Sequence, residues 1–320
     1  MRLWMWGSWL ESIAGEGAGR SSGLQEGGGE DYASHMSMDA ATSDKGSKGS
    51  EDSTAPDAPP RPSADLRHRY EAVKQRIADA TRKVGRKPDD VVLVAVTKNA
   101  SIDVVRELLA LGHRDFGENR AQQLANRATQ LNEYRQRIED HPESSGGVED
   151  LPEPRWHMIG QLQRNKVRKL VDHVRLVHSV DSMRLAEEIQ AQGARRDTQV
   201  EILIEVNLGE EQKGGIAAPA VRHVIDQMDS MLNVRVRGVM GMAPFTDDES
   251  VIRSAFDRCR DVFEDVRKQA NEPERIDILS MGMSNDFEIA IEYGANIVRV
   301  GTALVGEPVV EDPEEEPDQD

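Results

Sequence analysis

The stretch Val91-Val92-Leu93-Val94-Ala95-Val96-Thr97-Lys98-Asn99 determines how the rest of the chain can be interpreted. It opens with six consecutive apolar residues, rich in valine, which is typical of a strand buried on both faces. The run is closed by a lysine, and the carboxyl ends of parallel strands carry the ligand site in open sheets and in barrels. We therefore expect Lys98 to face a ligand. A solvated lysine that opens a loop is the alternative.

The chemistry of a lysine at such a strand end suggests what the ligand is. A lysine held against apolar walls is costly to charge, because burial disfavours the ammonium form and keeps the amine neutral more easily. A neutral lysine amine is a nucleophile toward aldehydes, and its commonest biological partner is pyridoxal phosphate. The strand alone leaves both interpretations of Lys98 open, so the rest of the chain has to decide between them.

Composition excludes several classes of protein. The chain has 320 residues, of which 38% are hydrophobic, and this is enough for the core of one large domain or two small ones. The single cysteine, Cys259, excludes an internal disulfide framework and favours a reducing cytoplasm. A net charge of −18 argues against a large nucleic-acid footprint, and the sequence has no apolar run long enough for a transmembrane helix. We expect a cytoplasmic protein that binds neither nucleic acid nor membrane.

The two ends of the chain differ in composition from its middle. Most of residues 1–62 are Gly, Ser, Asp, Glu, Pro and Ala, and residues 311–320 form an acidic run. Such segments cannot bury enough apolar surface to fold. We therefore expect a disordered leader at 1–62, a folded part at 63–308 and a disordered acidic tail at 309–320.

The folded part alternates strand-like and helix-like segments. It begins with an amphipathic helix that Ser63 is expected to cap. The strands are expected at about 91–97, within 113–119, and at 156–160, 176–179, 200–206, 234–240, 276–281 and 296–300. Eight strands, each followed by a helix, over roughly 240 residues predict an α/β fold of the (β/α)8 TIM-barrel type. A doubly wound sheet is the alternative, but it usually has a glycine-rich turn after its first strand, where this chain has Lys98.

Two late segments have the composition of a phosphate cradle. Ser284 follows the seventh strand and is expected to cap the next helix, whose first N–H groups could face an anion. Gly301 and Thr302 follow the eighth strand, where the glycine permits a close backbone approach and the threonine adds a hydroxyl. Each segment alone is usually only structural, but phosphates in these barrels commonly bind in the loops after strands seven and eight. Because the first strand neighbours the eighth in a closed barrel, we expect Lys98 on the same rim.

Several segments together resemble one known family, the pyridoxal phosphate homeostasis proteins of the alanine-racemase N-terminal barrel superfamily. The resemblance covers about residues 63–308, in the right order. The segments that carry it are Val94-Ala95-Val96-Thr97-Lys98, Phe116-Gly117-Glu118-Asn119, Trp156-His157-Met158-Ile159-Gly160-Gln161-Leu162-Gln163-Arg164-Asn165-Lys166, Ser280-Met281-Gly282-Met283-Ser284 and Val298-Arg299-Val300-Gly301-Thr302-Ala303.

The resemblance implies a barrel of the alanine-racemase N-terminal type that holds pyridoxal 5'-phosphate on Lys98 as an internal aldimine, a Schiff base. It also implies phosphate contacts from Ser284, Gly301 and Thr302. We further expect Asn119, which ends the second strand, to line this rim, with a role in a turn as the alternative. Members of the family are regarded as carriers or regulators of vitamin B6 and amino-acid pools, without an established turnover.

The same resemblance places Arg299 opposite the pyridine nitrogen of the cofactor. Arg299 precedes Gly301 by two residues and should therefore face the same side of the strand. A guanidinium only donates hydrogen bonds, so the ring nitrogen would accept one and stay unprotonated. An unprotonated ring is a poorer electron sink, which disfavours transaminase-like chemistry. A contact from Arg299 to the phosphate or to an acidic neighbour is the alternative.

We therefore expect a monomeric cofactor carrier without catalytic residues, whose partners are pyridoxal phosphate and the apo-forms of the enzymes that use it. The alternative is an amino-acid racemase. Racemisation needs a second acid/base opposite the lysine, and in the resembling racemases this is a tyrosine from a separate β-domain of a partner subunit. The barrel is expected to end near Gly306, so we expect no such domain here, and none of the tyrosines is expected at a strand end: Tyr32, Tyr70, Tyr134 and Tyr293.

Other polar and sulfur-containing residues carry weaker signals. His157 is expected to be a satisfied structural residue, and Lys166 to lie on the helix after the third strand. Lys213 lies in a glycine-containing loop that could act as a lid or contact an anion. The methionines expected in the core or the barrel wall are Met228, Met231, Met240 and Met242.

Overall fold

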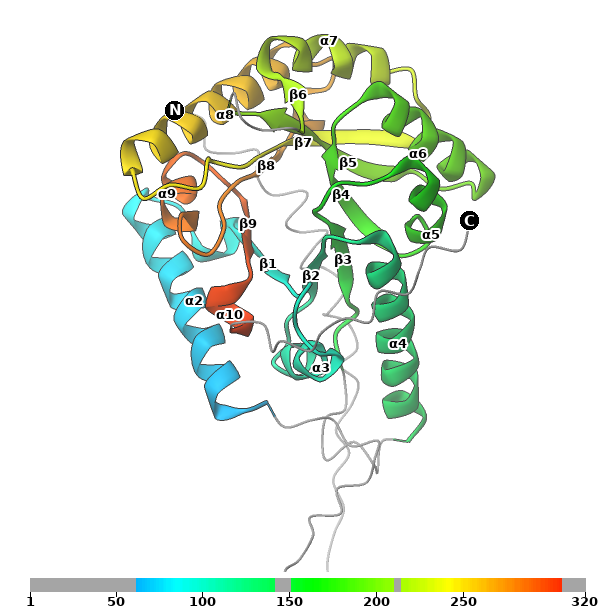
Figure 1. Ribbon diagram of the computed structural model, residues 1–320, viewed down its shortest axis with the longest axis vertical. Coiled ribbons are helices and arrows are strands. Elements are labelled where there is room, and N and C mark those ends of the chain that lie inside the picture. The colour runs from blue at the N-terminus through cyan, green and yellow to red at the C-terminus, as the bar shows by residue number, and fades with distance from the viewer. Residues whose placement is uncertain (1–61, 142–150, 210–213, 307–320) are drawn as a thin grey trace, which may run out of the picture.

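The computed structural model describes residues 62–141, 151–209 and 214–306. Parallel strands form one sheet, and the longer helices cover its outer face (Figure 1). The strands are β1 (Val92–Val96), β2 (Asp115–Glu118), β3 (Arg155–Met158), β4 (Val174–Val180), β5 (Val200–Asn207), β6 (Ile216–Ala217), β7 (Val234–Gly241), β8 (Ile278–Ser280) and β9 (Ile297–Val300). The α-helices are α2 (Ala64–Lys83), α3 (Ile102–Ala110), α4 (Ala121–Asp140), α5 (Val167–Leu170), α6 (Met183–Arg195), α7 (Ala218–Met228), α8 (Glu249–Gln269), α9 (Phe287–Glu292) and α10 (Thr302–Val305). Short 3-10 helices are η1 (Pro88–Asp90), η3 (Arg164–Lys166) and η4 (Pro273–Arg275).

Eight of these strands close into a barrel. The strand order is β4-β3-β2-β1-β9-β8-β7-β5, and β4 pairs with β5 to complete the ring. All of these pairings are parallel, and β1 lies against β9 in the register Val92↔Ile297 to Ala95↔Val300. The predicted (β/α)8 barrel is therefore confirmed, and so is the expected contact between its first and last strands. The two-residue strand β6 is an addition that pairs with β5 outside the ring.

The alternation of side chains along β1 explains its unbroken apolar run. Val92 and Val94 point into the barrel, where they pack with apolar side chains from the other strands. Val91 and Ala95 point outward into the larger core between the sheet and the helices. A strand with period two and apolar residues on both faces therefore contributes to two cores at once, as parallel barrel strands do.

The helix before β1 closes the outer layer beside the last strands. The Ser63 hydroxyl accepts a hydrogen bond from the Leu66 N–H, so the predicted N-cap is confirmed. The buried face of α2 includes Leu66, Val73 and Ile77, at the helical spacing seen in the sequence. Figure 1 shows α2 running alongside α9 and α10, which are the helices that follow β8 and β9.

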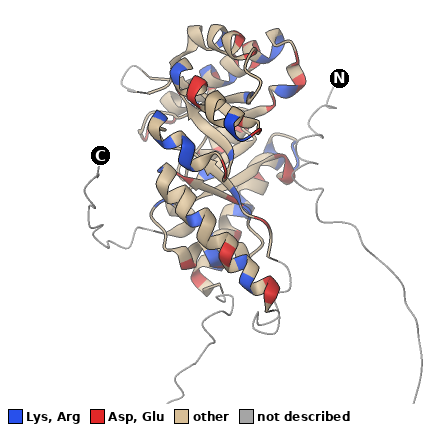
Figure 2. Ribbon diagram, turned by 90° about the vertical axis from the view of Figure 1, so that its right-hand side faces the viewer, with Lys and Arg blue, Asp and Glu red and all other residues tan. Residues whose placement is uncertain are grey.

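Some predicted segments differ in extent from the structure, and others lie outside it. The helix expected after the third strand is the 3-10 turn η3 followed by the single α-helical turn α5. The leader and the tail lie outside the described residues, except for residue 62, and so does Lys213. Among the residues that are described, no helix combines the length and apolar character that crossing a membrane requires. Figure 2 shows acidic and basic residues interspersed along the outer helices.

The amino ends of the strands are held by buried ion pairs. Arg237, on β7, is only 3% exposed and donates to Glu201 on β5 at 2.5 Å. It also donates through both Nε and Nη2 to the carboxylate of Asp277, at 3.0 and 2.6 Å. This end of the barrel therefore contributes to stability, while the carboxyl ends of the strands are left for a ligand.

Candidate functional site

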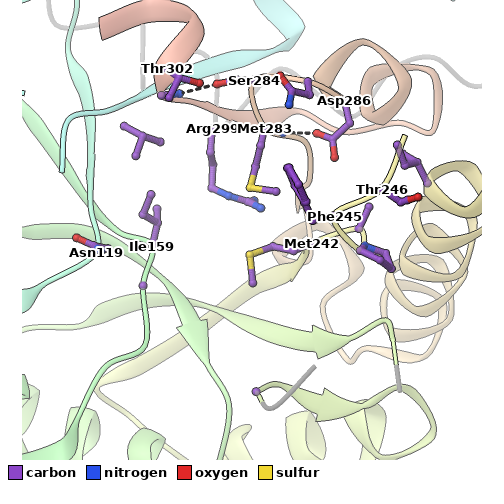
Figure 3. A pocket seen from close by; sticks show the side chains of 18 of the residues that line it. Asn119, Ile159, Met242, Phe245, Thr246, Met283, Ser284, Asp286, Arg299 and Thr302 are labelled. Carbon is purple, nitrogen blue, oxygen red and sulfur yellow. Dashed lines mark hydrogen bonds between the residues drawn. The ribbon is translucent and has the colours of Figure 1, made fainter. Parts of the chain in front are cut away.

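A cavity of about 950 Å³ opens at the carboxyl ends of the strands. Side chains of strand ends and of the loops that follow them line it, and Figure 3 shows how they converge. The structure brings all of the predicted cofactor-binding residues to this one cavity: Lys98, Asn119, Ser284, Arg299, Gly301 and Thr302. In Figure 3 the Arg299 side chain extends into the middle of the pocket, with Ser284 and Thr302 on one side and Asn119 across from them.

Lys98 lies two residues beyond the end of β1, at the start of the loop to α3. Its side chain lines the cavity but is exposed, so the expectation of an amine held against apolar walls is wrong. The reason is local: β1 ends at Val96, and the chain leaves the sheet before it reaches the lysine. The amine is therefore accessible from the cavity and from solvent.

Helix α4 holds the backbone that carries Lys98. Gln123 donates to the Lys98 carbonyl oxygen at 2.9 Å. Arg127 donates to the Thr97 carbonyl at 2.6 Å and also to the carbonyl of Ala100. The carbonyls of Thr97, Lys98 and Ala100 thus all accept from side chains of α4, which fixes the backbone from which the lysine side chain extends.

Glu118 supports this arrangement from the outer face of the barrel. It is fully buried, and its Oε1 accepts from Arg127 at 2.5 Å and from the Thr97 hydroxyl at 2.6 Å. Burial raises the pKa of Glu118, although the charge of Arg127 opposes the shift. Glu118 therefore helps to hold the Lys98 loop, and it is not one of the residues that line the cavity.

The loop after β8 differs from its predicted form. Helix α9 begins after Asp286, so Ser284 is not its N-cap, and that prediction is wrong. Instead, the Ser284 oxygen accepts from the Gly301 N–H at 3.2 Å and from the Ala303 N–H at 3.4 Å. Gly282 makes this loop possible, because its φ is +89° and an added Cβ would lie 2.7 Å from the Phe287 Cα. Ser284 thus joins the two loops that were predicted to form the cradle.

These two loops present several hydrogen-bond donors to the same region. Within the described residues, the backbone N–H groups of Ser284, Asn285 and Thr302 have no protein acceptor. The Thr302 hydroxyl is exposed at the cavity, and the Ser284 hydroxyl has a hydrogen to donate because its oxygen only accepts in this structure. A side chain at position 301 would occupy the space beside Val96, which also lines the cavity. This donor set fits an anion such as a phosphate group.

Arg299 is the cation at the centre of the cavity. It is only 3% exposed, and it donates from Nη1 to the Ser280 hydroxyl oxygen at 2.6 Å and from Nη2 to the Gly241 carbonyl at 3.2 Å. Burial lowers its pKa to about 10, and the charges of Asp286 and Glu205 oppose the shift. A guanidinium has five N–H donors, so donors remain that can face a ligand in the cavity.

The sequence analysis missed several residues that line the cavity. Asp181 follows β4 and Glu205 lies near the end of β5, so their position at strand ends could have identified them. The pKa of Glu205 is raised by burial and by the charge of Asp181. Met242 was expected in the core or the barrel wall, and it lines the cavity beside Phe245, which is 98% exposed. The periodicity of a strand cannot place these two residues, because they lie in the loop after β7.

The remaining polar positions lie elsewhere. His157 is buried and hydrogen bonded on both ring nitrogens, as expected of a structural residue. Lys166 ends η3 and is not among the cavity-lining residues. The described tyrosines belong to α2, α4 and the end of α9, while Tyr32 lies outside the described residues. Among the side chains that the structure describes, no three histidines, cysteines and carboxylates are grouped as a metal site would require.

Comparison with known proteins agrees with this architecture. The model of the family "Alanine racemase, N-terminal domain" matches residues 67–308. The pyridoxal phosphate homeostasis protein of Aquifex aeolicus is 35% identical over 240 residues, which are 75% of this chain and 96% of the relative. The protein of the same name from Pseudomonas aeruginosa is 35% identical over 235 residues, covering 73% and 92% of the two chains.

Solved structures extend the comparison. PipY of Synechococcus elongatus, solved with pyridoxal phosphate bound, is 32% identical, and the match covers 72% of this chain and 100% of PipY with a TM-score of 0.60. Alanine racemase from Corynebacterium glutamicum is 17% identical, and that match covers 75% of this chain and 63% of the racemase with a TM-score of 0.53. The second similarity concerns the fold alone.

Proposed function

This chain belongs to the alanine racemase N-terminal domain family and to the pyridoxal phosphate homeostasis proteins within it, and we propose that it binds pyridoxal 5'-phosphate as a carrier or regulator in vitamin B6 homeostasis. The observation that carries the proposal is the convergence of an accessible lysine, an arginine and a set of free donors on one cavity. When bound, the cofactor supplies an aldehyde for amines and a pyridine ring that can withdraw electrons.

Lys98 is proposed as the covalent anchor. Its amine would hold the cofactor through the aldehyde carbon by a carbon–nitrogen double bond, with the aldehyde oxygen and both hydrogens of the neutral amine lost as water. The contacts from Arg127 and Gln123 to the loop support this role, because they fix the backbone from which the amine extends. The exposure of Lys98 supports a carrier, since a second amine that competes for the aldehyde can reach the same place.

The two loops after β8 and β9 are proposed to hold the phosphate group. The N–H groups of Ser284, Asn285 and Thr302 and the hydroxyls of Ser284 and Thr302 would donate to its oxygens. Gly301 is part of this site because its N–H holds Ser284 in place and because it has no side chain that would fill the space beside Val96. Asn119, on the opposite side of the cavity, would contact the ring.

Arg299 is proposed to face the ring nitrogen and to limit the chemistry of the site. Because a guanidinium only donates, the ring nitrogen would stay an acceptor and the ring would be a weak electron sink. The alternative function, amino-acid racemisation, also requires a second acid/base. The described cavity-lining residues include carboxylates, Asp181 and Glu205 among them, but no tyrosine, histidine or cysteine. We therefore infer that amino acids are not turned over efficiently.

We also propose that the protein is a cytoplasmic monomer that transfers its cofactor to apo-forms of pyridoxal phosphate enzymes. The single cysteine supports a reducing compartment, and the open position of Lys98 supports exchange with other proteins. No nucleic acid or membrane surface is part of this proposal, in line with the net charge of −18.

Two measurements on the loaded protein test the function. Incubation with an apo-enzyme should restore the activity of that enzyme, whereas the Lys98→Ala protein treated in the same way should restore much less. Incubation with L-alanine in deuterated water should give negligible deuterium at the α-carbon. Steady deuterium incorporation that depends on Lys98 would favour the racemase alternative over the carrier.

A further inference from the structure

A continuous chain of hydrogen bonds crosses the inside of the barrel from Arg299 to Asp115. Arg299 Nη1 lies 2.6 Å from Ser280 Oγ, and Ser280 Oγ lies 3.0 Å from His178 Nδ1. His178 Nε2 lies 2.9 Å from His157 Nδ1, and His157 Nε2 lies 3.1 Å from Asp115 Oδ1. All five residues are buried, and they come from β9, β8, β4, β3 and β2. The hydrogen-bond chain therefore starts at the cofactor pocket, crosses the barrel interior from β8 to β4, and continues through β3 to β2.

The residues at the two ends of this hydrogen-bond chain determine the direction in which its members donate. Arg299 can only donate, and an ionised Asp115 can only accept. If His157 donates from Nε2 to Asp115, its Nδ1 accepts from His178 Nε2–H. His178 Nδ1 then accepts from the Ser280 hydroxyl, which leaves the Ser280 oxygen to accept from Arg299. Every donor and acceptor in the chain is used once, with both histidines neutral and protonated on Nε2.

A protonated histidine would break this order. If His157 carried a proton on both nitrogens, His178 would have to donate from Nδ1 to Ser280, and the Ser280 hydroxyl would have no acceptor left in the chain. The pKa of His178 is lowered mainly by burial and also by the charge of Arg299, which favours its neutral form. The pKa of Asp115 is lowered to about 2, because the hydrogen bond from His157 and the charge of Arg155 outweigh its burial.

The chain matters to Arg299 because the guanidinium is buried without a carboxylate at salt-bridge distance among the described residues. Its side-chain acceptor is Ser280, and its other acceptor is the Gly241 carbonyl. A hydroxyl that donates onward is a stronger acceptor than one that does not, since hydrogen bonds in series polarise one another. Holding Nη1 and Nη2 in this way also sets the directions of the remaining N–H groups.

We propose that Ser280, His178 and His157 are positioning residues that fix the orientation of the Arg299 guanidinium toward the cofactor pocket. The part of this inference that concerns the cofactor rests on the proposed function. The direction of the chain and the immobility of Arg299 are properties of the protein alone, so they can be tested without cofactor.

Heteronuclear NMR tests the hydrogen-bond chain directly. It uses the full-length wild-type protein with its histidines and arginines labelled with the heavy nitrogen isotope. The nitrogen shifts distinguish the two neutral tautomers from the imidazolium. At neutral pH we expect both His157 and His178 as the neutral Nε2–H form. An Nδ1–H tautomer or an imidazolium at either position would overturn the inference.

Variants at position 178 test whether the hydrogen-bond chain holds the Arg299 guanidinium in place. His178→Leu removes both hydrogen bonds, whereas His178→Gln retains a carbonyl that accepts from Ser280 and an N–H that donates to His157. We expect His178→Leu to bind pyridoxal phosphate roughly tenfold more weakly in equilibrium dialysis and to speed exchange of the Arg299 guanidinium protons with water. His178→Gln should stay within about twofold of the wild type. The control His113→Leu should also stay within about twofold, because it removes another buried histidine, whose partners are Tyr70 and the Asp115 backbone carbonyl.

The outcomes separate this inference from the proposed function. A folded His178→Leu protein that binds the cofactor and protects Arg299 as the wild type does would overturn the inference. His178→Gln behaving like His178→Leu would also overturn it, because the hydrogen bonds would then not be what matters. If His178→Leu does not fold, Ser280→Ala removes the Nη1 acceptor and takes its place. If the wild type binds no pyridoxal phosphate, the proposed function fails, while the histidine tautomers and the Arg299 proton exchange still decide the positioning role.

Discussion

Replacing Arg127 with methionine tests how helix α4 holds the loop that carries Lys98. Arg127 Nη1 lies 2.6 Å from the Thr97 carbonyl oxygen and 2.5 Å from Glu118 Oε1, and Nη2 donates to the Ala100 carbonyl. Methionine fills a similar volume but donates no hydrogen bond. All three acceptors therefore lose this donor in a single substitution, and the loop loses its main attachment to the helix.

The size of the effect is set by Glu118. This carboxylate is 0% exposed, its Oε2 has no partner among the described residues, and after the substitution only the Thr97 hydroxyl would still donate to Oε1. Removing one member of a buried ion pair costs about 3–5 kcal/mol, because the other charge is left buried and unpaired. We expect Arg127→Met to lower the free energy of unfolding by about this amount near neutral pH.

The loss of stability caused by Arg127→Met should also depend on pH. Burial already raises the pKa of Glu118 from its ordinary 4.5, against the charge of Arg127. An acid with a higher pKa in the folded state binds more protons there than in the unfolded state, so its contribution to stability falls as the pH rises from about 4.5 through the folded-state pKa. Without Arg127 the pKa of Glu118 rises further. The variant should therefore lose more stability at about pH 8 than at about pH 5.

Urea denaturation followed by circular dichroism at the two pH values measures these losses. Arg137→Met is the matched control, because it makes the same substitution at an exposed position of the same helix and should change stability by less than about 0.5 kcal/mol. The reasoning would be refuted if Arg127→Met were as stable as the wild type. It would also be refuted if the loss had the same size at both pH values.

Three further predictions concern the proposed phosphate site, the ion pairs at the amino end of the barrel, and the two terminal segments of the chain. The double variant Ser284→Ala/Thr302→Val should bind pyridoxal phosphate more weakly by about 1.5–3 kcal/mol per lost hydrogen bond, and unchanged binding in equilibrium dialysis would exclude both from the phosphate site. Arg237→Met should lose about 3–5 kcal/mol of stability in urea while the folded protein binds cofactor normally; weaker binding would contradict this separation. Deleting residues 1–62 and 309–320 should leave the Tm unchanged, and a large fall would show that one segment packs on the barrel.

The barrel and the location of the site could be predicted from the sequence because both depend on local patterns. The apolar run of β1 and the alternation of strands and helices predict parallel strands, and parallel strands gather their carboxyl ends at one face. Lys98, Ser284 and Thr302 each follow a strand, so the fold alone brings them to one cavity. Their neighbourhood followed from topology and did not need a knowledge of side-chain contacts.

The local geometry could not be predicted in the same way. Ser284 has the sequence position of a helix cap, but the Gly301 N–H, which is distant in sequence, provides the partner that its oxygen accepts from. Likewise, His178 and Ser280 are separated by 102 positions in the chain, and only the closed barrel places them 3.0 Å apart. Contacts across the inside of a barrel depend on register and closure, which a strand pattern does not specify.

Locating the covalently held cofactor tests the central claim most directly. The full-length protein is incubated with pyridoxal phosphate, reduced with borohydride, digested and examined by peptide mass spectrometry. We expect one added cofactor per chain on the peptide that contains Lys98, its loss in Lys98→Ala, and its retention in Lys166→Ala, which changes a lysine outside the cavity lining. Stoichiometric addition to a different lysine, or addition that persists in Lys98→Ala, would contradict the assignment.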